Sequence, residues 1–213
     1  MKDIAVIGLG NFGFSIAREY ATEGGNVLAI DINDEKVQEV SDFVTYAVRA
    51  DVTEPEVIKG VGLENVDIAI IAISNNMEAS VMATIIAKEL GVPEIIAKAT
   101  NDIHAKILKK VGADRVVFPE KEMGIKIAKN ISLNRFKDII DLQENYSIIE
   151  VQVPKNWVGK NLTELNPRKK YGFNVIASRR EHELTINLNP TTPFDENESI
   201  IVIGKNELLQ KVF

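Results

Sequence analysis

Residues 3–13 read DIAVIGLGNFG, and residues 27–31 read VLAID. The apolar residues 3–7 predict a strand, the glycines after them predict a tight turn, and residues 11 to about 23 predict a helix. A strand, a GxGxxG turn, a helix and a second strand that ends in an acid follow one another in dinucleotide-binding proteins. These residues therefore predict the first βαβ unit of a nucleotide-binding fold.

Each glycine of this turn has an expected task. Gly8 permits the tight turn, Gly10 lets the backbone approach a pyrophosphate, and Gly13 lets the helix pack closely on the strand. The N-terminus of the helix then directs free N–H groups at the phosphates. Asp31 is expected to accept hydrogen bonds from the ribose hydroxyls and to repel a 2′-phosphate. Glycines also serve ordinary turns, but the two strands, the helix and the acid favour the nucleotide interpretation.

The composition is that of a soluble globular protein, because 45% of the 213 residues are hydrophobic and 26% are charged. No signal pattern and no apolar run long enough to span a bilayer is present, so we expect no direct membrane insertion. The absence of cysteine excludes disulfides and thiolate metal sites, and it fits a cytoplasmic location. The net charge of −6 argues against nucleic-acid binding. Two basic clusters, Arg168-Lys169-Lys170 and Arg179-Arg180, are interpreted as solvated surface.

The first 138 residues alternate between short apolar runs and amphipathic stretches. The expected strands are residues 4–7, 27–30, 46–48, 68–73, 95–97 and 116–118, and the expected helices are 11–23, 33–43, 54–60, 76–90, 102–111 and 120–135. This alternation predicts right-handed βαβ units and an α/β fold of the doubly wound, Rossmann-like type. The six-stranded parallel sheet should have the order 3-2-1-4-5-6, with a ligand where the order reverses.

The same rule nominates the residues that follow the strand ends. Asp51 and Thr53 follow the third strand, Ser74 and Asn75 follow the fourth, Lys98 ends the fifth, and Glu120 follows the sixth. Helix capping is an equally good interpretation of Asp51, Thr53 and Ser74. A structural ion pair is the alternative for Lys98 and Glu120.

The sixth helix, residues 120–135, carries more apolar surface than one buried face needs. Met123, Ile127 and Ile131 form one stripe, and Ile125 and Ala128 add apolar surface elsewhere around the helix. Either the helix lies in the core of the chain or it contacts a second subunit.

The pattern changes near residue 137, so we expect a nucleotide-binding domain in residues 1–138 and a small α+β domain in residues 139–213. Residues 138–142, 147–153, 175–179, 184–188 and 200–203 predict strands, residues 162–170 a short helical or turn segment, and residues 207–212 a short helix. The prolines of this half exclude long helices.

Catalytic groups are hard to find in this sequence. His104 and His182 are the only histidines and are expected on the surface. No tyrosine is followed four residues later by lysine, two histidines without cysteine make no usual zinc site, and no P-loop or GxSxG motif is present. The chain is therefore expected to bind a nucleotide without transforming a substrate.

The whole chain resembles the cytoplasmic RCK proteins of the Ktr/Trk potassium-uptake systems. In the first half the resemblance rests on residues 5–13, Asp31, Asp51, Lys98-Ala99, Gly112-Ala113-Asp114 and Pro119-Glu120. In the second half it rests on residues 168–175 and 200–204, which are similar to the C-terminal lobe of that family.

The resemblance implies a homodimer that assembles into a larger ring, expected to be an octamer, beneath a potassium-translocating membrane subunit at the inner face of the membrane. It implies that residues 120–135 are the subunit-crossing helix. It also implies an adenine nucleotide (ATP or ADP) or NAD(H) in the N-terminal lobe. Together with the fold it gives these predicted contacts: Gly8, Gly10, Asn11, Phe12, Gly13, Asp31, Ile32, Asp51, Val52, Ser74, Asn75, Lys98 and Glu120.

Two features refine the expected ligands. Many ATP-regulated relatives have arginine where this chain has Asn11, so ADP, AMP or NAD(H) gain weight over ATP. With ATP, Glu120 is expected near the phosphates and their cation, Mg²⁺ or another. Many Gram-positive relatives also bind cyclic di-AMP in the C-terminal lobe, and the matching positions here are Pro167, Arg168, Asn174, Val175 and Pro190.

Two alternatives remain open at this point. In the first alternative, the chain is an NAD(H)-dependent oxidoreductase that uses His104 or Lys98 as acid or base. In the second, it is a nucleotide or redox sensor for a partner other than a channel. The sequence does not decide which nucleotide is physiological or whether the ligand opens or closes the pore.

Overall fold

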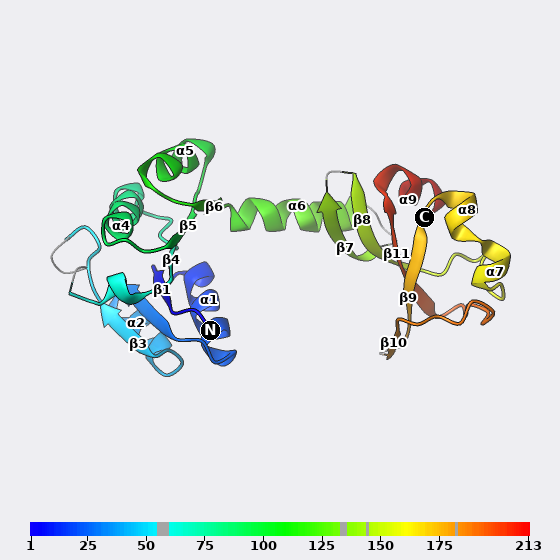
Figure 1. The fold of residues 1–213 in the computed structure, drawn as a ribbon, viewed down its shortest axis with the longest axis horizontal. Coiled ribbons are helices and arrows are strands. Elements are labelled where there is room, and N and C mark those ends of the chain that lie inside the picture. The colour runs from blue at the N-terminus through cyan, green and yellow to red at the C-terminus, as the bar shows by residue number, and fades with distance from the viewer. Residues whose placement is uncertain (55–59, 133–135, 144, 182) are drawn as a thin grey trace. The chain divides into compact units, whose positions relative to one another are not determined.

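The computed structural model describes residues 1–54, 60–132, 136–143, 145–181 and 183–213 (Figure 1). This part of the chain divides into two units, Met1–Lys121 and Glu122–Phe213, which are described separately. The division falls inside helix α6 (Pro119–Ser132). The predicted boundary after residue 138 assigns that helix to the first domain, and this assignment stays a prediction.

Six parallel strands form the sheet of the first unit in the order β3-β2-β1-β4-β5-β6, as predicted. The strands are β1 (Ile4–Ile7), β2 (Val27–Asp31), β3 (Tyr46–Arg49), β4 (Ile68–Ile71), β5 (Glu94–Lys98) and β6 (Arg115–Val117). β1 pairs with β2 on one side and with β4 on the other. The carboxyl end of β1 is therefore the point where the strand order reverses and where ligands of such sheets bind.

Helices cover both faces of this sheet (Figure 1). They are α1 (Asn11–Thr22), α2 (Asp34–Ser41), α4 (Met77–Glu89) and α5 (Asp102–Val111), with a short 3₁₀ helix, η1 (Leu63–Asn65). Ala17 of α1 and Val37 of α2 pack with Val6 on one face. Ala83 of α4 and Leu108 of α5 pack with Ile7 on the other face. Both faces of the sheet are buried, which explains why its strands are apolar without alternation.

Two predicted elements of the first unit differ from the structure or cannot be compared with it. β4 ends at Ile71, two residues before the predicted end at residue 73. Its neighbour β1 ends at Ile7, which is paired with Ile71, and the turn at Gly8 then crosses the backbone of residues 72 and 73. Of the predicted helix at 54–60, residues 55–59 lie outside the described part of the chain.

The second unit contains a five-stranded antiparallel sheet in the order β10-β9-β11-β8-β7. Its strands are β7 (Phe136–Gln143), β8 (Tyr146–Gln152), β9 (Asn174–Arg180), β10 (Glu183–Thr185) and β11 (Glu198–Lys205), and its further helices are α7 (Leu162–Leu165), α8 (Pro167–Tyr171) and α9 (Asn206–Val212). The predicted strand at residues 184–188 is shorter in the structure, because β10 pairs with β9 only over residues 183–185.

The core of the second unit is built around two buried aromatic rings. Trp157 and Phe173 stack with ring centroids 6.2 Å apart, and Tyr171 and Phe194 also stack on Trp157. Ile200 of β11 lies in the same cluster. The unit therefore has its own hydrophobic core, as expected for residues 139–213.

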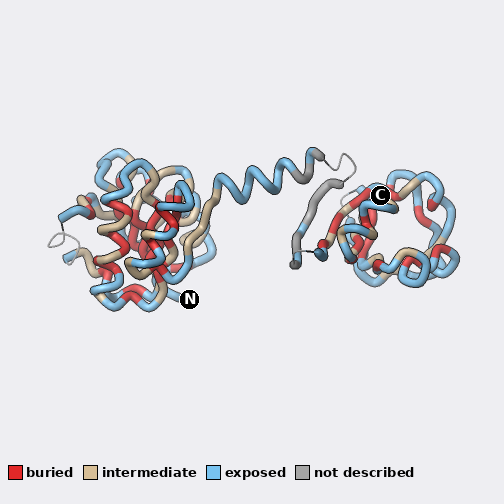
Figure 2. Tube along the Cα trace, turned by 90° about the horizontal axis from the view of Figure 1, so that it is seen from above, coloured by how far each residue is buried: buried red, intermediate tan, exposed pale blue. Residues whose placement is uncertain are grey.

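Helix α6 is exposed along residues 121–128 and at Ile131, as the pale tube in Figure 2 shows. Met123, Ile125, Ile127 and Ile131 are between 50% and 69% exposed. The interpretation of this stripe as ordinary core of the chain is therefore wrong, and its apolar surface is left for another contact.

Candidate functional site

The three glycines after β1 have different surroundings. Gly8 has φ +97, and a Cβ there would lie 3.0 Å from the backbone N of Ile73. A Cβ on Gly13 would lie 1.9 Å from the carbonyl oxygen of Gly8, so only glycine lets α1 approach the loop this closely. A Cβ on Gly10 would meet nothing within 4 Å. The loop is thus packed tightly at Gly8 and Gly13 and leaves open space beside Gly10.

The N-terminus of α1 adjoins that open space. Its N-cap residue is Gly10, no side chain caps the helix, and its first turn contains no acidic residue. The first N–H groups of a helix have no partner within the helix, and the helix dipole adds positive potential there. Phosphate groups bind at helix ends of this kind.

Asp31 holds the glycine loop to the end of β2. Its Oδ2 accepts a hydrogen bond from the backbone N–H of Leu9 at 2.6 Å, and its Oδ1 accepts one from the N–H of Asn33 at 2.8 Å. The ammonium of Lys36 lies 3.8 Å from Oδ2. Ile32 is exposed beside it. The carboxylate thus lies next to the loop, where a ribose has to share it with these N–H groups. Ribose binding by Asp31 remains a prediction.

Asp51 forms a local turn after β3. Its Oδ1 accepts hydrogen bonds from the hydroxyl of Thr53 at 2.7 Å and from the N–H of Thr53 at 2.9 Å. These two bonds lower the pKa of the Asp51 carboxyl below its usual value, since they stabilise the charged form. Val52 is buried. Contact of Asp51 and Val52 with an adenine stays a prediction.

The loop after β4 gives a correction. Ser74 does not cap α4, because that helix begins at Met77 and is capped by Asn76, whose Oδ1 accepts a hydrogen bond from the N–H of Ala79 at 3.1 Å. Ser74 is half-buried and Asn75 is exposed. Asn33 and Asn101 cap α2 and α5 in the same way. Asparagine before a helix is the sequence signal that identifies all three caps.

Lys98 and Glu120 form an ion pair, with Lys98 Nζ 2.5 Å from Glu120 Oε1. The side chain of Lys98 is 7% exposed, whereas that of Glu120 is 71% exposed. Lys98 Nζ also lies 5.6 Å from the centroid of the Phe12 ring in the first turn of α1. The hydrogen bond from Lys98 is the main cause that lowers the pKa of Glu120. The structural ion pair anticipated from the sequence is present, and a nucleotide contact of either residue stays a prediction.

The described residues do not form a metal site by themselves. No group of three or more histidine, aspartate or glutamate side chains suited to a metal ion occurs in this part of the chain. Glu120 offers a single carboxylate, and that carboxylate is paired with an ammonium. The described residues therefore do not fit a cation held by the protein alone.

His104 was expected on the surface, and this prediction is wrong. The residue is 1% exposed, because its helix α5 packs on the sheet and against α4. Its Nδ1 lies 3.4 Å from the backbone N of Thr100 and accepts that N–H, while its Nε2 has no hydrogen-bond partner in the described part of the chain. Burial lowers the pKa of the imidazole. A histidine enclosed in this way has no contact with a substrate. His182 lies outside the described residues.

The five residues proposed for cyclic di-AMP lie in the second unit. Pro167 is buried at the start of α8, and Arg168 is exposed on the same helix. Asn174 is exposed at the start of β9, and Val175 next to it is half-buried. Pro190 is exposed, and its carbonyl oxygen accepts hydrogen bonds from the N–H and the hydroxyl of Thr163 of α7. Their binding role remains a prediction.

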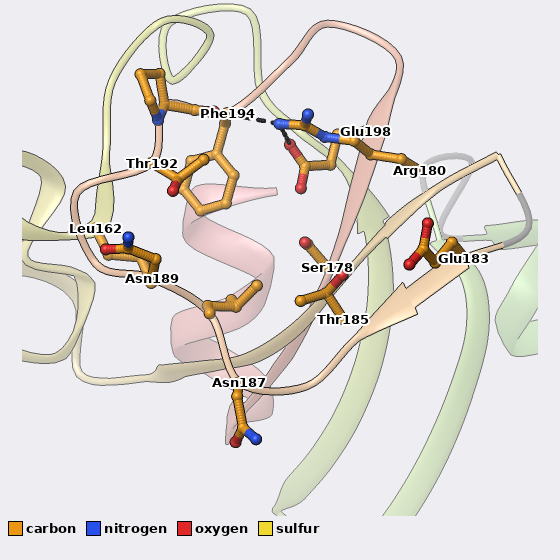
Figure 3. Close-up of a pocket in the computed structure, with 12 residues that line it drawn as sticks. Leu162, Ser178, Arg180, Glu183, Thr185, Asn187, Asn189, Thr192, Phe194 and Glu198 are labelled. Carbon is orange, nitrogen blue, oxygen red and sulfur yellow. Dashed lines mark hydrogen bonds and ion pairs between the residues drawn. The ribbon is translucent and has the colours of Figure 1, made fainter.

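A pocket of about 360 Å³ lies elsewhere in the second unit (Figure 3). Arg180 and Glu198 lie at one side of it and are joined by an ion pair of 3.2 Å, above the ring of Phe194. None of the five residues proposed for cyclic di-AMP is among its described lining residues. Arg179 pairs with Glu150. Both arginines thus pair with carboxylates, while the side chain of Arg180 remains 54% exposed at the surface, as expected, and that of Arg179 is 34% exposed.

Comparison with known proteins gives matches over nearly the whole chain. The model of the TrkA-N domain matches residues 4–119, and that of the TrkA-C domain matches residues 147–213. The Ktr system potassium uptake protein C of Bacillus subtilis (strain 168) is 42% identical over 203 residues, 95% of this chain and 92% of that protein. The Ktr system potassium uptake protein A of the same organism is 38% identical over 210 residues, 99% of this chain and 95% of that protein.

A solved structure agrees in fold. The GsuK channel bound to NAD has a TM-score of 0.63 and is 17% identical, and the match covers 98% of this chain and 38% of that chain. At this identity the likeness shows the fold alone. In the described part of the chain no helix has the length and apolar character needed to cross a membrane.

Proposed function

The chain belongs to the TrkA-N/TrkA-C family as a regulatory subunit of the Ktr potassium-uptake type, and on this premise we propose that it senses an adenine nucleotide and controls potassium flux through a membrane partner. The nucleotide binds at the carboxyl end of β1. Binding changes the conformation of a homodimer within a ring, and the ring transmits that change to the potassium-translocating subunit. The protein then acts in the cytoplasm, at the inner face of the membrane.

One observation carries the nucleotide part of the proposal. The open space beside Gly10, at the uncapped N-terminus of α1, lies between two positions of the loop, Gly8 and Gly13, where the backbone is packed too tightly for a Cβ. Such a space suits the pyrophosphate of ADP or NAD(H). Asn11 is uncharged, so no side chain at this position favours a third phosphate, and ADP or NAD(H) is preferred to ATP. NAD is the ligand named for the GsuK channel.

The exposed stripe of α6 supports the proposed dimer. The stripe consists of Met123, Ile127 and Ile131, which lie on one side of α6 and are each at least half exposed. A second copy of the helix provides apolar surface of the same kind, and burial of this area stabilises the pair. The octameric ring is the assembly expected from the family.

A second ligand, cyclic di-AMP, is proposed for the C-terminal lobe. Arg168 is exposed on α8 and is available to a phosphate, while Asn174 and the half-buried Val175 begin the adjacent strand β9. α8 and β9 are in contact, so these groups are close enough to form one surface. The Arg168→Ala variant should lose cyclic di-AMP and keep the ligand of the N-terminal lobe.

The function is tested by calorimetry on the purified chain with ADP, ATP, NAD⁺, NADH and cyclic di-AMP, together with mass spectrometry of any ligand released on denaturation. We expect tight binding of ADP or NAD(H), and restored potassium uptake when the chain is expressed with its membrane partner in cells that lack their own uptake systems. Failure of all five ligands to bind contradicts the sensor. Steady oxidation of NADH with a substrate contradicts the regulatory assignment and restores the oxidoreductase alternative.

A further inference from the structure

Lys98 is the buried member of its ion pair, and Glu120 is the exposed one. The side chain is 7% exposed at the end of β5, between the Phe12 ring of α1 and the Glu120 carboxylate of α6. A buried ammonium is costly unless an anion stays beside it. The folded protein is therefore stabilised when an anion lies beside Lys98.

The carboxylate of Glu120 is free to leave. The Glu120 side chain is 71% exposed, so its carboxylate is already largely hydrated and can move away from Lys98 into water. Lys98 cannot follow it without giving up its buried position. The same ammonium lies beside the start of α1, because it is 5.6 Å from the ring centroid of Phe12 in the first turn of that helix, which follows Gly10. A phosphate oxygen bound at that helix end is a strong, charged hydrogen-bond acceptor for an ammonium.

We propose that Lys98 alternates between two anions, the Glu120 carboxylate and a phosphate of the bound nucleotide, so that phosphate binding releases the first turn of α6. This inference rests on the proposed nucleotide site and adds the step by which its occupancy reaches α6. The exchange breaks one ion pair and forms another, and no covalent bond changes.

The geometry of α6 gives the exchange a consequence. In the part of the chain that the structure describes, the ion pairs of Lys98 with Glu120 and of Asp102 with Lys121 hold the first turn of the helix. In the second pair the side chains are 80% and 61% exposed and lie 3.7 Å apart, so it contributes little. Loss of the first pair therefore removes the stronger of these two constraints from a helix that continues without interruption to Ser132.

The first test is calorimetry in EDTA with ADP and with adenosine, which lacks the phosphates. Glu120→Gln removes the competing anion, so ADP should bind about two- to fivefold more tightly, the range of a partly exposed charge pair. Adenosine affinity should not change. Lys98→Met should weaken ADP binding more than tenfold. In the double variant that carries both substitutions, the gain in ADP affinity from Glu120→Gln should disappear. Glu122→Gln, which removes the next acid of α6, is the control for a general charge effect and should leave ADP affinity as it is.

The second test is hydrogen exchange of the peptide that covers residues 119–126. ADP should raise its exchange rate in the wild type, and adenosine should not. In Glu120→Gln the rate should already be high and should not respond to ADP. Unchanged or weaker ADP binding by Glu120→Gln overturns the alternation, and so does slower exchange of α6 with ADP. If no variant and no wild-type sample binds ADP, both the alternation and the nucleotide site are wrong, and the two failures are thereby distinguished.

Discussion

The backbone N–H of Leu9 and the carboxylate of Asp31 lie 2.6 Å apart, so the acid at the end of β2 fastens the glycine loop that follows β1. Asp31 is nearly buried and also accepts the N–H of Asn33. The same carboxylate is the proposed partner of the ribose. It therefore has two tasks, one in stability and one in ligand binding, and the two are separable by experiment.

Asp31→Ala should lower the free energy of unfolding by about 1–3 kcal/mol, because it leaves the N–H groups of Leu9 and Asn33 without their acceptor. The substitution should also weaken the binding of ADP by at least about tenfold. Urea unfolding and calorimetry measure the two effects. Asp42→Ala, at an exposed acid after α2, is the matched control and should change neither. Full ADP affinity in Asp31→Ala removes Asp31 from the binding site.

Gly10→Ala and Gly13→Ala should separate binding from folding. The Gly10 backbone is extended and a Cβ there meets nothing within 4 Å, so this variant should lose only about 1 kcal/mol of stability, the scale of a glycine-to-alanine change at an N-cap. Its added methyl occupies the space proposed for the pyrophosphate, so ADP affinity should fall at least about tenfold. Thermal unfolding and calorimetry test both statements. Normal ADP binding by folded Gly10→Ala places the phosphates elsewhere.

Gly13→Ala provides the contrast. The new Cβ would lie 1.9 Å from the Gly8 carbonyl oxygen, a backbone atom that cannot move without shifting α1 or the loop. We expect the free energy of unfolding to fall by about 3 kcal/mol or more, as for an overpacked site, and the soluble yield to fall as well. Denaturant unfolding measures it. A stability equal to that of the wild type contradicts the close approach of α1 to the loop.

The strand order and most helix bounds follow from local sequence patterns. Residues 27–30 are apolar without a break, which indicates a strand buried on both faces, and Asn101 before residue 102 fixes the start of α5. The tight glycine loop after β1 was predictable because glycine spacing reports backbone geometry directly. Gly8 and Gly13 confirm this, since both meet backbone atoms that exclude a Cβ.

Features that depend on packing between distant elements were not predictable. Burial of His104 requires α4 to cover α5, and single-sequence periodicity does not specify this. The pairing of Arg180 with Glu198 depends on the register of β9 and β11. Lys98 and Glu120 were placed at one edge by topology, but the unequal exposure that distinguishes them appears only in the structure.

Burial of His104 predicts a pH-dependent stability. The folded-state pKa of the imidazole is lowered by desolvation, so below its ordinary value of 6.5 the unfolded chain binds a proton that the folded chain does not. The contribution of neutral His104 to the free energy of unfolding is thus complete above about pH 6.5, and it is lost as the pH falls from there toward the folded-state pKa. Urea unfolding between pH 8 and pH 5 should show this loss. His104→Asn, which keeps an acceptor for Thr100, should show a smaller one. If the free energy of unfolding depends on pH equally in the wild type and in His104→Asn, the pH-dependent loss of stability does not come from His104.

The apolar stripe of α6 predicts the oligomeric state. Ile127→Asp should weaken the homodimer by about a hundredfold or more, because it places a carboxylate in the apolar contact proposed for a second copy. The fold of each unit should be preserved, since Ile127 is half exposed and does not belong to either core. Light scattering at micromolar concentration measures the mass, and circular dichroism checks the fold. Glu122→Gln, on the same exposed helix, should retain the wild-type mass. If Ile127→Asp retains it as well, the stripe is not the dimer contact and the proposed route from nucleotide to ring through α6 loses its basis.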